Sequence, residues 1–132
     1  MAERNIDRVR AALASLNRDG PEAILELLDP DVEWVADRSD MGRVTYRGIE
    51  GVRRSFEELY EGFDELGFEA DELHEAGDRI VAIGHMYARG RSTGITDRIP
   101  LGIVFTAGSD GKLTRYESFR DPNEALEAAG IK

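Results

Sequence analysis

Four segments with alternating apolar residues follow one another in the second half of the sequence, separated only by short turn-forming stretches. The segments span residues 68–76, 79–91, 95–107 and 112–120, and the breaks between them read AGD, STG and GSDG. Glycine and aspartate in such breaks suit tight turns, and strands joined by tight turns must run antiparallel. The second half is therefore predicted to be an antiparallel meander.

The first half carries helical spacing instead. Apolar residues recur every three or four positions over residues 5–20, with Asn5 as a candidate N-cap and Gly20 as a candidate stop. A second, shorter helix is predicted from Pro21 to about Asp29, because a proline at the first helical position is favourable and Pro30 would end the helix.

Three further elements complete the pattern. The stretch VEWVA, residues 32–36, reads as a short strand, and residues 37–48 read as a polar loop. An apolar stripe predicts a long helix over residues 49–66 that Gly67 closes. A last short helix is predicted over residues 122–130, where Asp121, followed by a proline and then Glu124, is placed as its N-terminal cap.

The resulting order, α-α-β-α-β-β-β-β-α, predicts the α+β class. A twisted antiparallel sheet that curves around a long helix encloses a conical cavity, as in a cystatin-like α+β barrel. A length of 132 residues suits one domain, 1–132.

Composition removes several functions from consideration. The net charge of −10 disfavours nucleic acid and anionic membranes as partners. The chain has no cysteine and two histidines, so we expect neither a metal site nor a cofactor. No stretch is long and apolar enough to span a bilayer and the N-terminus lacks a signal core, so a cytoplasmic location is expected.

The strand predicted over residues 79–91, RIVAIGHMYARGR, has two different faces. One face carries only small or apolar residues, whereas the other begins with Val81 and Ile83 and continues with His85 and Tyr87. Counting the register from the AGD turn puts the His85 face inside the cavity, and counting from the far end turns it outward. We favour the first register, because tight turns fix register well. The other face, with Ile80, would then be convex and apolar.

The chain resembles SnoaL-like proteins of the nuclear transport factor 2-like superfamily, which share their fold with ketosteroid isomerase, scytalone dehydratase and limonene epoxide hydrolase. The resemblance rests on LLDPDVEW, YRGIEGVRRSFEELYEGF, AGDRIVAIGHMYARGRSTG and GKLTRYESFRDPNEALEAAGI, and it covers nearly the whole chain. It implies the cone-shaped fold and a small-molecule ligand, but it does not select one reaction.

Ketosteroid isomerase uses a carboxylate base, with a tyrosine and a protonated acid that donate to the enolate. Aligned with that pattern, the base falls at Ala36 or, with a shift of one residue, at Asp37. The tyrosine falls at Ala12 and the acid at Gly102. Steroid isomerisation by that mechanism is therefore not expected.

The other two enzymatic patterns are also incomplete. The arginine of limonene epoxide hydrolase matches Arg79, but its two acids fall at Val81 and Ser118. Scytalone dehydratase uses a pair of histidines inside the cone, and His85 is the single counterpart that this sequence offers.

We expect a small apolar or aromatic ligand in the cavity and a homodimer formed through the sheet. His85, with Asp37 as second choice, is the candidate for a cofactor-independent proton transfer on a carbonyl or polyketide-like substrate, as in an isomerase, cyclase or dehydratase. The alternative is a non-catalytic module that binds a ligand or mediates dimerisation. The residues expected to bind the ligand are Trp34, Phe56, Tyr60, Phe63, Tyr87, Tyr116, Ser118 and Arg120.

Overall fold

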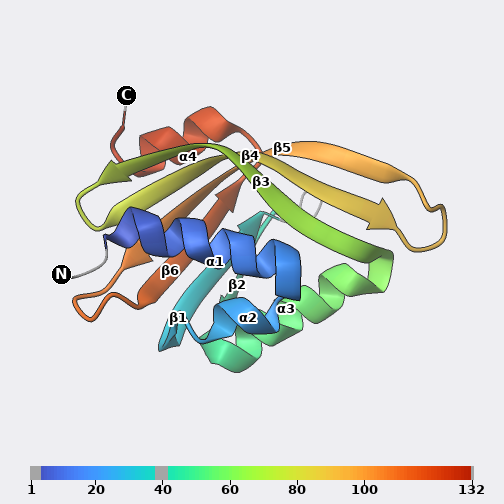
Figure 1. Ribbon diagram of the computed structural model, residues 1–132, viewed down its shortest axis with the longest axis horizontal. Coiled ribbons are helices and arrows are strands. Elements are labelled where there is room, and N and C mark those ends of the chain that lie inside the picture. Colours follow the sequence, from blue (N-terminus) through green and yellow to red (C-terminus); the bar gives the residue numbers. More distant parts are fainter. Residues whose placement is uncertain (1–3, 38–41, 132) are drawn as a thin grey trace.

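The computed structural model describes residues 4–37 and 42–131. Within them the chain forms a mixed α+β fold around one curved sheet (Figure 1). The elements in order are α1 (Asn5–Asp19), α2 (Glu22–Leu25), β1 (Leu28–Asp37), β2 (Arg43–Arg47), α3 (Gly48–Gly62), β3 (Phe63–Ala76), β4 (Arg79–Gly90), β5 (Thr96–Ala107), β6 (Leu113–Phe119) and α4 (Pro122–Ala128).

The sheet has the strand order β2-β1-β6-β5-β4-β3 and is open, with β2 and β3 at its edges. The predicted meander of β3, β4, β5 and β6 is antiparallel throughout, which confirms the fold class. One pairing departs from a purely antiparallel sheet, because β1 lies parallel to β6. The strand from the first half of the chain is thereby inserted into the sheet beside the last strand.

Two boundaries around α3 differ from the sequence-based prediction. Residues 43–47, which were expected to lie in a loop, form strand β2 against β1, with Val44 opposite Ala36. The third helix ends at Gly62 rather than near Leu66, and β3 begins at the next residue. The apolar spacing of Phe63 and Leu66 continues the helical stripe, but in the structure these two side chains belong to the strand.

The N-terminal helices also differ at their ends. Helix α1 stops before Gly20 as expected, but its N-cap position is Arg4, so Asn5 is the first helical residue and not the cap. Helix α2 ends at Leu25, earlier than expected, and Pro30 lies inside the longer strand β1 instead of after a helix. At the other end of the chain, Asp121 does cap α4, since its carboxylate accepts the backbone N–H of Asn123 at 2.9 Å.

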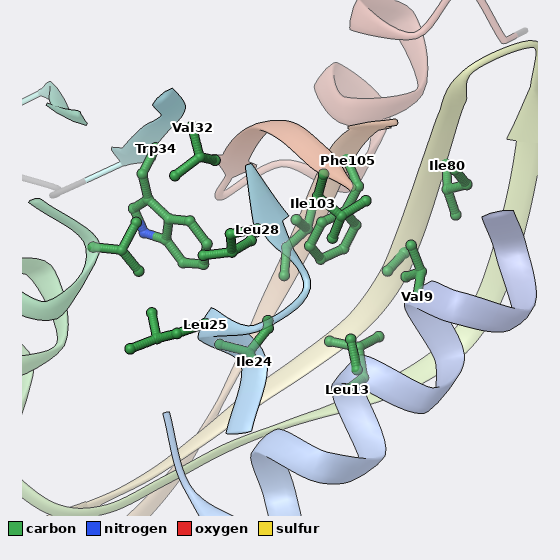
Figure 2. Close-up of a cluster of buried hydrophobic side chains, with 14 of the residues drawn as sticks. Val9, Leu13, Ile24, Leu25, Leu28, Val32, Trp34, Ile80, Ile103 and Phe105 are labelled. Atoms are coloured by element: carbon green, nitrogen blue, oxygen red, sulfur yellow. The ribbon is translucent and has the colours of Figure 1, made fainter. Parts of the chain in front are cut away.

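The sheet is covered on both faces. On the concave face, Val9 and Leu13 of α1 point toward Ile80, Ile103 and Phe105 of the sheet (Figure 2). On the convex face, α4 packs over a smaller cluster, which consists of Val81, Val104, Ala125 and Ala129 with Ile83, Phe119, Leu126 and Ile131 at its border. The turn-proximal half of β4 is therefore buried on both sides.

A β-bulge interrupts the pairing of β3 with β4. The register between the two strands shifts between Ala70 and Glu72, so that Asp71 is an extra, bulged residue. Opposite this bulge a side chain on Gly84 would overlap the backbone carbonyl oxygen of Glu69. Glycine at position 84 therefore allows the two backbones to approach closely next to the bulge.

Candidate functional site

The concave face of β4 is its even-numbered face. Ile80, Ala82 and Met86 face the main core, whereas Val81 and Ile83 face α4. The register predicted from the AGD turn is thus wrong by one residue, and the apolar face expected on the convex side is the one that lines the interior. The sequence could not separate the two faces, because α4 buries the convex face as fully as the core buries the concave one.

A cavity of about 250 Å³ lies between the concave face of the sheet and helices α1, α2 and α3. Its wall is mostly aliphatic and aromatic. The candidate site residues from the sequence analysis that line it are Trp34, Asp37, Phe56, Tyr60, Phe63, Tyr116, Ser118 and Arg120. Their common location agrees with the expectation that they surround a ligand, although their role in binding stays a prediction.

Aromatic rings form one side of the cavity. Trp34 of β1 stacks on Tyr116 of β6 with ring centroids 3.7 Å apart and an angle of 4° between the planes. Phe56 of α3 lies 5.7 Å from Trp34, and Phe105 of β5 meets Tyr116 edge-on at 5.7 Å. The parallel pairing of β1 with β6 produces this stack, because it sets Trp34 directly beside Tyr116.

Polar groups gather where β1 and β6 end. The backbone N–H of Asp37 donates to Ser118 Oγ at 2.9 Å, and the backbone N–H of Arg120 donates to Asp37 Oδ2 at 3.3 Å. Ser118 is 4% exposed, whereas Arg120 is exposed. These bonds hold a carboxylate, a buried hydroxyl and the stem of a guanidinium side by side on the cavity wall.

Helix α3 brings Tyr60 toward the same end of the cavity. The helix runs in the direction of β1, since Gly48 lies near Pro30 at the start of both elements and Phe56 meets Trp34 further along. Tyr60 follows Phe56 by one helical turn. Burial, and to a lesser degree the neighbouring phenol of Tyr87, raises the pKa of Tyr60, so its hydroxyl stays protonated and able to donate at neutral pH.

Two predicted site residues, His85 and Tyr87, are not among the residues that line the cavity. They lie on the convex face of β4, beyond the area that α4 covers. The ring of Tyr87 crosses Gly67, the residue that was expected to close the third helix. Nδ1 of His85 is 3.2 Å from Asp71 Oδ2 but lacks hydrogen-bond geometry.

Several lining residues were not identified from the sequence. They include Leu13, Leu16, Ile24, Ser55, Leu59, Met86, Ile99, Leu101, Ile103 and Phe105. Ser55 is 1% exposed and interrupts the apolar stripe of α3 between Val52 and Phe56, a signal that could have marked it. The alternation of Ile99, Leu101 and Ile103 along β5 is a second signal, but it does not say which side of the sheet is hollow.

In the part of the chain that the structure describes, no three His, Asp or Glu side chains converge on a possible metal position. None of the helices described there combines the length and the apolar character needed to cross a bilayer.

Comparison with known proteins gives a consistent assignment. A family model described as SnoaL-like domain matches residues 9–116. An NTF2-like protein from Burkholderia thailandensis E264 has 26% identity and a TM-score of 0.78, and the match covers 99% of this chain and 100% of that one. A putative SnoaL-like polyketide cyclase from Shewanella denitrificans OS-217 has 16% identity and a TM-score of 0.71, with 94% and 97% covered.

A third similar structure contains a small molecule. It is TerC co-crystallised with polyporic acid, with 27% identity and a TM-score of 0.76 over 96% of this chain and 98% of TerC. No curated protein matches the sequence significantly.

Proposed function

Because the chain belongs to the SnoaL-like domain family, we propose that its cavity binds a small, largely apolar or aromatic molecule and that Asp37 transfers a proton on it. Ligands of this kind are carbonyl or polyketide-like compounds, and the reaction is of the isomerase, cyclase or dehydratase type. No metal or organic cofactor takes part in such a step. The co-crystal of TerC with polyporic acid supports the choice of a small organic ligand.

The observation that carries this proposal is the placement of the Asp37 carboxylate at an otherwise apolar and aromatic cavity wall. A base in such a site can take a proton from a carbon next to a carbonyl group, while the carbonyl oxygen receives the electron pair as an enolate. Ser118 and Arg120 lie next to Asp37 and can donate to that oxygen. The proton then returns to another position of the substrate.

One observation favours the alternative, a module that binds a ligand without chemistry. Oδ2 of Asp37 already accepts the backbone N–H of Arg120. The backbone N–H of Asp37 in turn donates to Ser118 Oγ, so Asp37 links these two residues. A carboxylate with this bonding can serve to shape the wall alone. The two functions share the cavity and differ only in the task of Asp37.

Filling the cavity tests the part that both functions share. Ile99→Trp should reduce the affinity for polyporic acid at least about tenfold, because Ile99 lines the cavity and the larger ring would take the space of the ligand. Ile95→Trp is the matched control, since Ile95 is 61% exposed at the tip of the same hairpin. Titration calorimetry of both variants measures the difference. Equal affinities in the two variants would place binding outside the cavity.

We also propose a homodimer through the convex face of the sheet beyond α4. Tyr87, His85 and Pro100 occupy neighbouring positions there, and an ion pair between Arg98 and Glu69 at 2.8 Å borders them. Replacing Tyr87 with glutamate should convert the dimer to a monomer, because a buried unpaired charge at an interface is costly. Sedimentation velocity at the concentration of the binding titrations measures this. A wild-type monomer would contradict the proposal.

A further inference from the structure

The charged residues on the cavity wall differ in the hydrogen bonds that their side chains make. Among the described residues that line the cavity, Asp37 and Arg120 are the charged ones. The Asp37 carboxylate accepts the backbone N–H of Arg120. The guanidinium group of Arg120, in contrast, makes no hydrogen bond or ion pair within residues 4–37 and 42–131, although acidic residues outnumber basic ones 27 to 17 in this chain.

A second donor near Arg120 is also unused. Ser118 Oγ accepts the backbone N–H of Asp37, but its own hydroxyl hydrogen donates to no group in the described residues. The side chain is nevertheless 4% exposed and lines the cavity. A ligand oxygen that accepts a hydrogen bond from this buried hydroxyl would therefore be bound more favourably than an apolar group.

Tyr116 and Ser118 lie on the same face of β6, and Arg120, which directly follows the strand, lines the same cavity wall. Along this face the wall changes from the aromatic stack of Trp34 on Tyr116, through a buried hydroxyl, to an exposed guanidinium group. A bound molecule meets apolar surface at its inner end and two hydrogen-bond donors at its outer end. The donors can hold one anionic oxygen between them, and guanidinium groups favour carboxylates and related oxyanions.

From this arrangement we propose that the ligand is an aromatic anion, whose rings lie against Trp34 and Tyr116 and whose acidic oxygen group is held by Ser118 and Arg120. This inference rests on the proposed binding function and narrows its ligand class. The preference for an anion comes from Ser118 and Arg120 alone, because the net charge of −10 repels anions at longer range. A neutral molecule of the same shape that lacks an oxygen acceptor at this end would leave both donors unpaired, and a neutral carbonyl oxygen would be held less strongly than an anionic oxygen.

Two fluorescent probes that differ by one anionic group test the ligand class. Anilinonaphthalene sulfonate is anionic, and N-phenylnaphthylamine has the same ring skeleton without the charge. The wild-type protein should bind the anionic probe about tenfold more tightly, the size expected for a charge-assisted hydrogen bond at a partly exposed site. Arg120→Gln should abolish this preference and leave the affinity for the neutral probe nearly unchanged. Ser118→Ala should reduce the preference in the same direction.

The control is Arg54→Gln. Arg54 is exposed on α3, makes no ion pair among the described residues and does not line the cavity, so this variant removes one positive charge without touching the wall. It should keep the full preference. Equal binding of both probes by the wild type, or an equal loss in the two arginine variants, would overturn the proposed ligand class while cavity binding stands. Failure of both probes to bind would overturn the cavity function and this inference together.

Discussion

Replacing Asp37 with asparagine is expected to slow proton exchange on a cavity-bound ketone by about a hundred- to ten-thousand-fold, the range for removing a positioned general base. The test uses tetralone in deuterium oxide, where the wild type should speed the incorporation of deuterium next to the carbonyl group. Asparagine keeps the size of the side chain and an oxygen that can accept the backbone N–H of Arg120 at 3.3 Å, but it cannot take the proton. Proton magnetic resonance of the ketone follows the rate.

The control for this substitution is Asp121→Asn. Asp121 is the next residue after Arg120 and caps α4 through the backbone N–H of Asn123. Asparagine is an equally good N-cap, so this variant removes a nearby charge and preserves the fold. It should exchange at the wild-type rate. If the wild type itself shows no exchange above the solvent background while it binds the ketone, the chain is a binding module.

The largest loss of stability is expected from Trp34→Ala. Trp34 is 4% exposed and contacts both the ring of Tyr116 and that of Phe56. Its removal should lower the free energy of unfolding by about 3 to 5 kcal/mol, the cost of emptying a large aromatic position in a core. Urea denaturation followed by circular dichroism measures the change.

The variant Trp34→Phe separates the loss of stacking from the loss of volume. Phenylalanine can still lie against Tyr116, so its cost should be less than half that of alanine. Because the alanine variant also joins new space to the cavity, bulkier ring systems should bind to it relatively better. Equal stability of the wild type and the alanine variant would mean that the stack does not support the fold.

The helical and strand segments of this chain could largely be recognised from apolar spacing, but boundaries without turn residues could not. Strand β3 follows α3 directly at Phe63, and the apolar residues Phe63 and Leu66 suit either element. Residues 43–47 do alternate between polar and apolar side chains, but the run is short and has only two apolar residues, Val44 and Tyr46. It therefore reads as a loop until the pairing of β2 with β1 is known.

The orientation of β4, that is, which of its two faces points into the core, could not be predicted for a different reason. Alternation shows which residues share a face, but the direction of that face depends on what covers it. Here Ala125 of α4 and Ala129, the C-cap of that helix, bury Val81, so both faces of the first half of β4 are apolar. The polar second half, His85 and Tyr87, lies where α4 no longer covers the sheet. Only the position of α4, distant in sequence, resolves the choice.

The residues of the candidate site at the ends of β1 and β6 could be predicted better than the orientation of β4. Asp37, Tyr116, Ser118 and Arg120 do meet at one cavity, because the ends of β1 and β6 are adjacent in the sheet. Their hydrogen bonds could not be predicted, since they depend on the parallel register that sets Trp34 beside Tyr116. The same register places Asp37 within reach of both Ser118 and Arg120.

The parallel pairing of β1 with β6 also sets the order in which the protein can assemble during synthesis. When β1 leaves the ribosome, its sheet neighbour β2 soon follows, whereas its other neighbour β6 emerges only after α3, β3, β4 and β5. Contacts between segments so distant in sequence form slowly and late. The aromatic wall therefore closes among the last events of folding, and a nascent chain that lacks β6 has an exposed tryptophan face and no chamber in which a ligand could stabilise it.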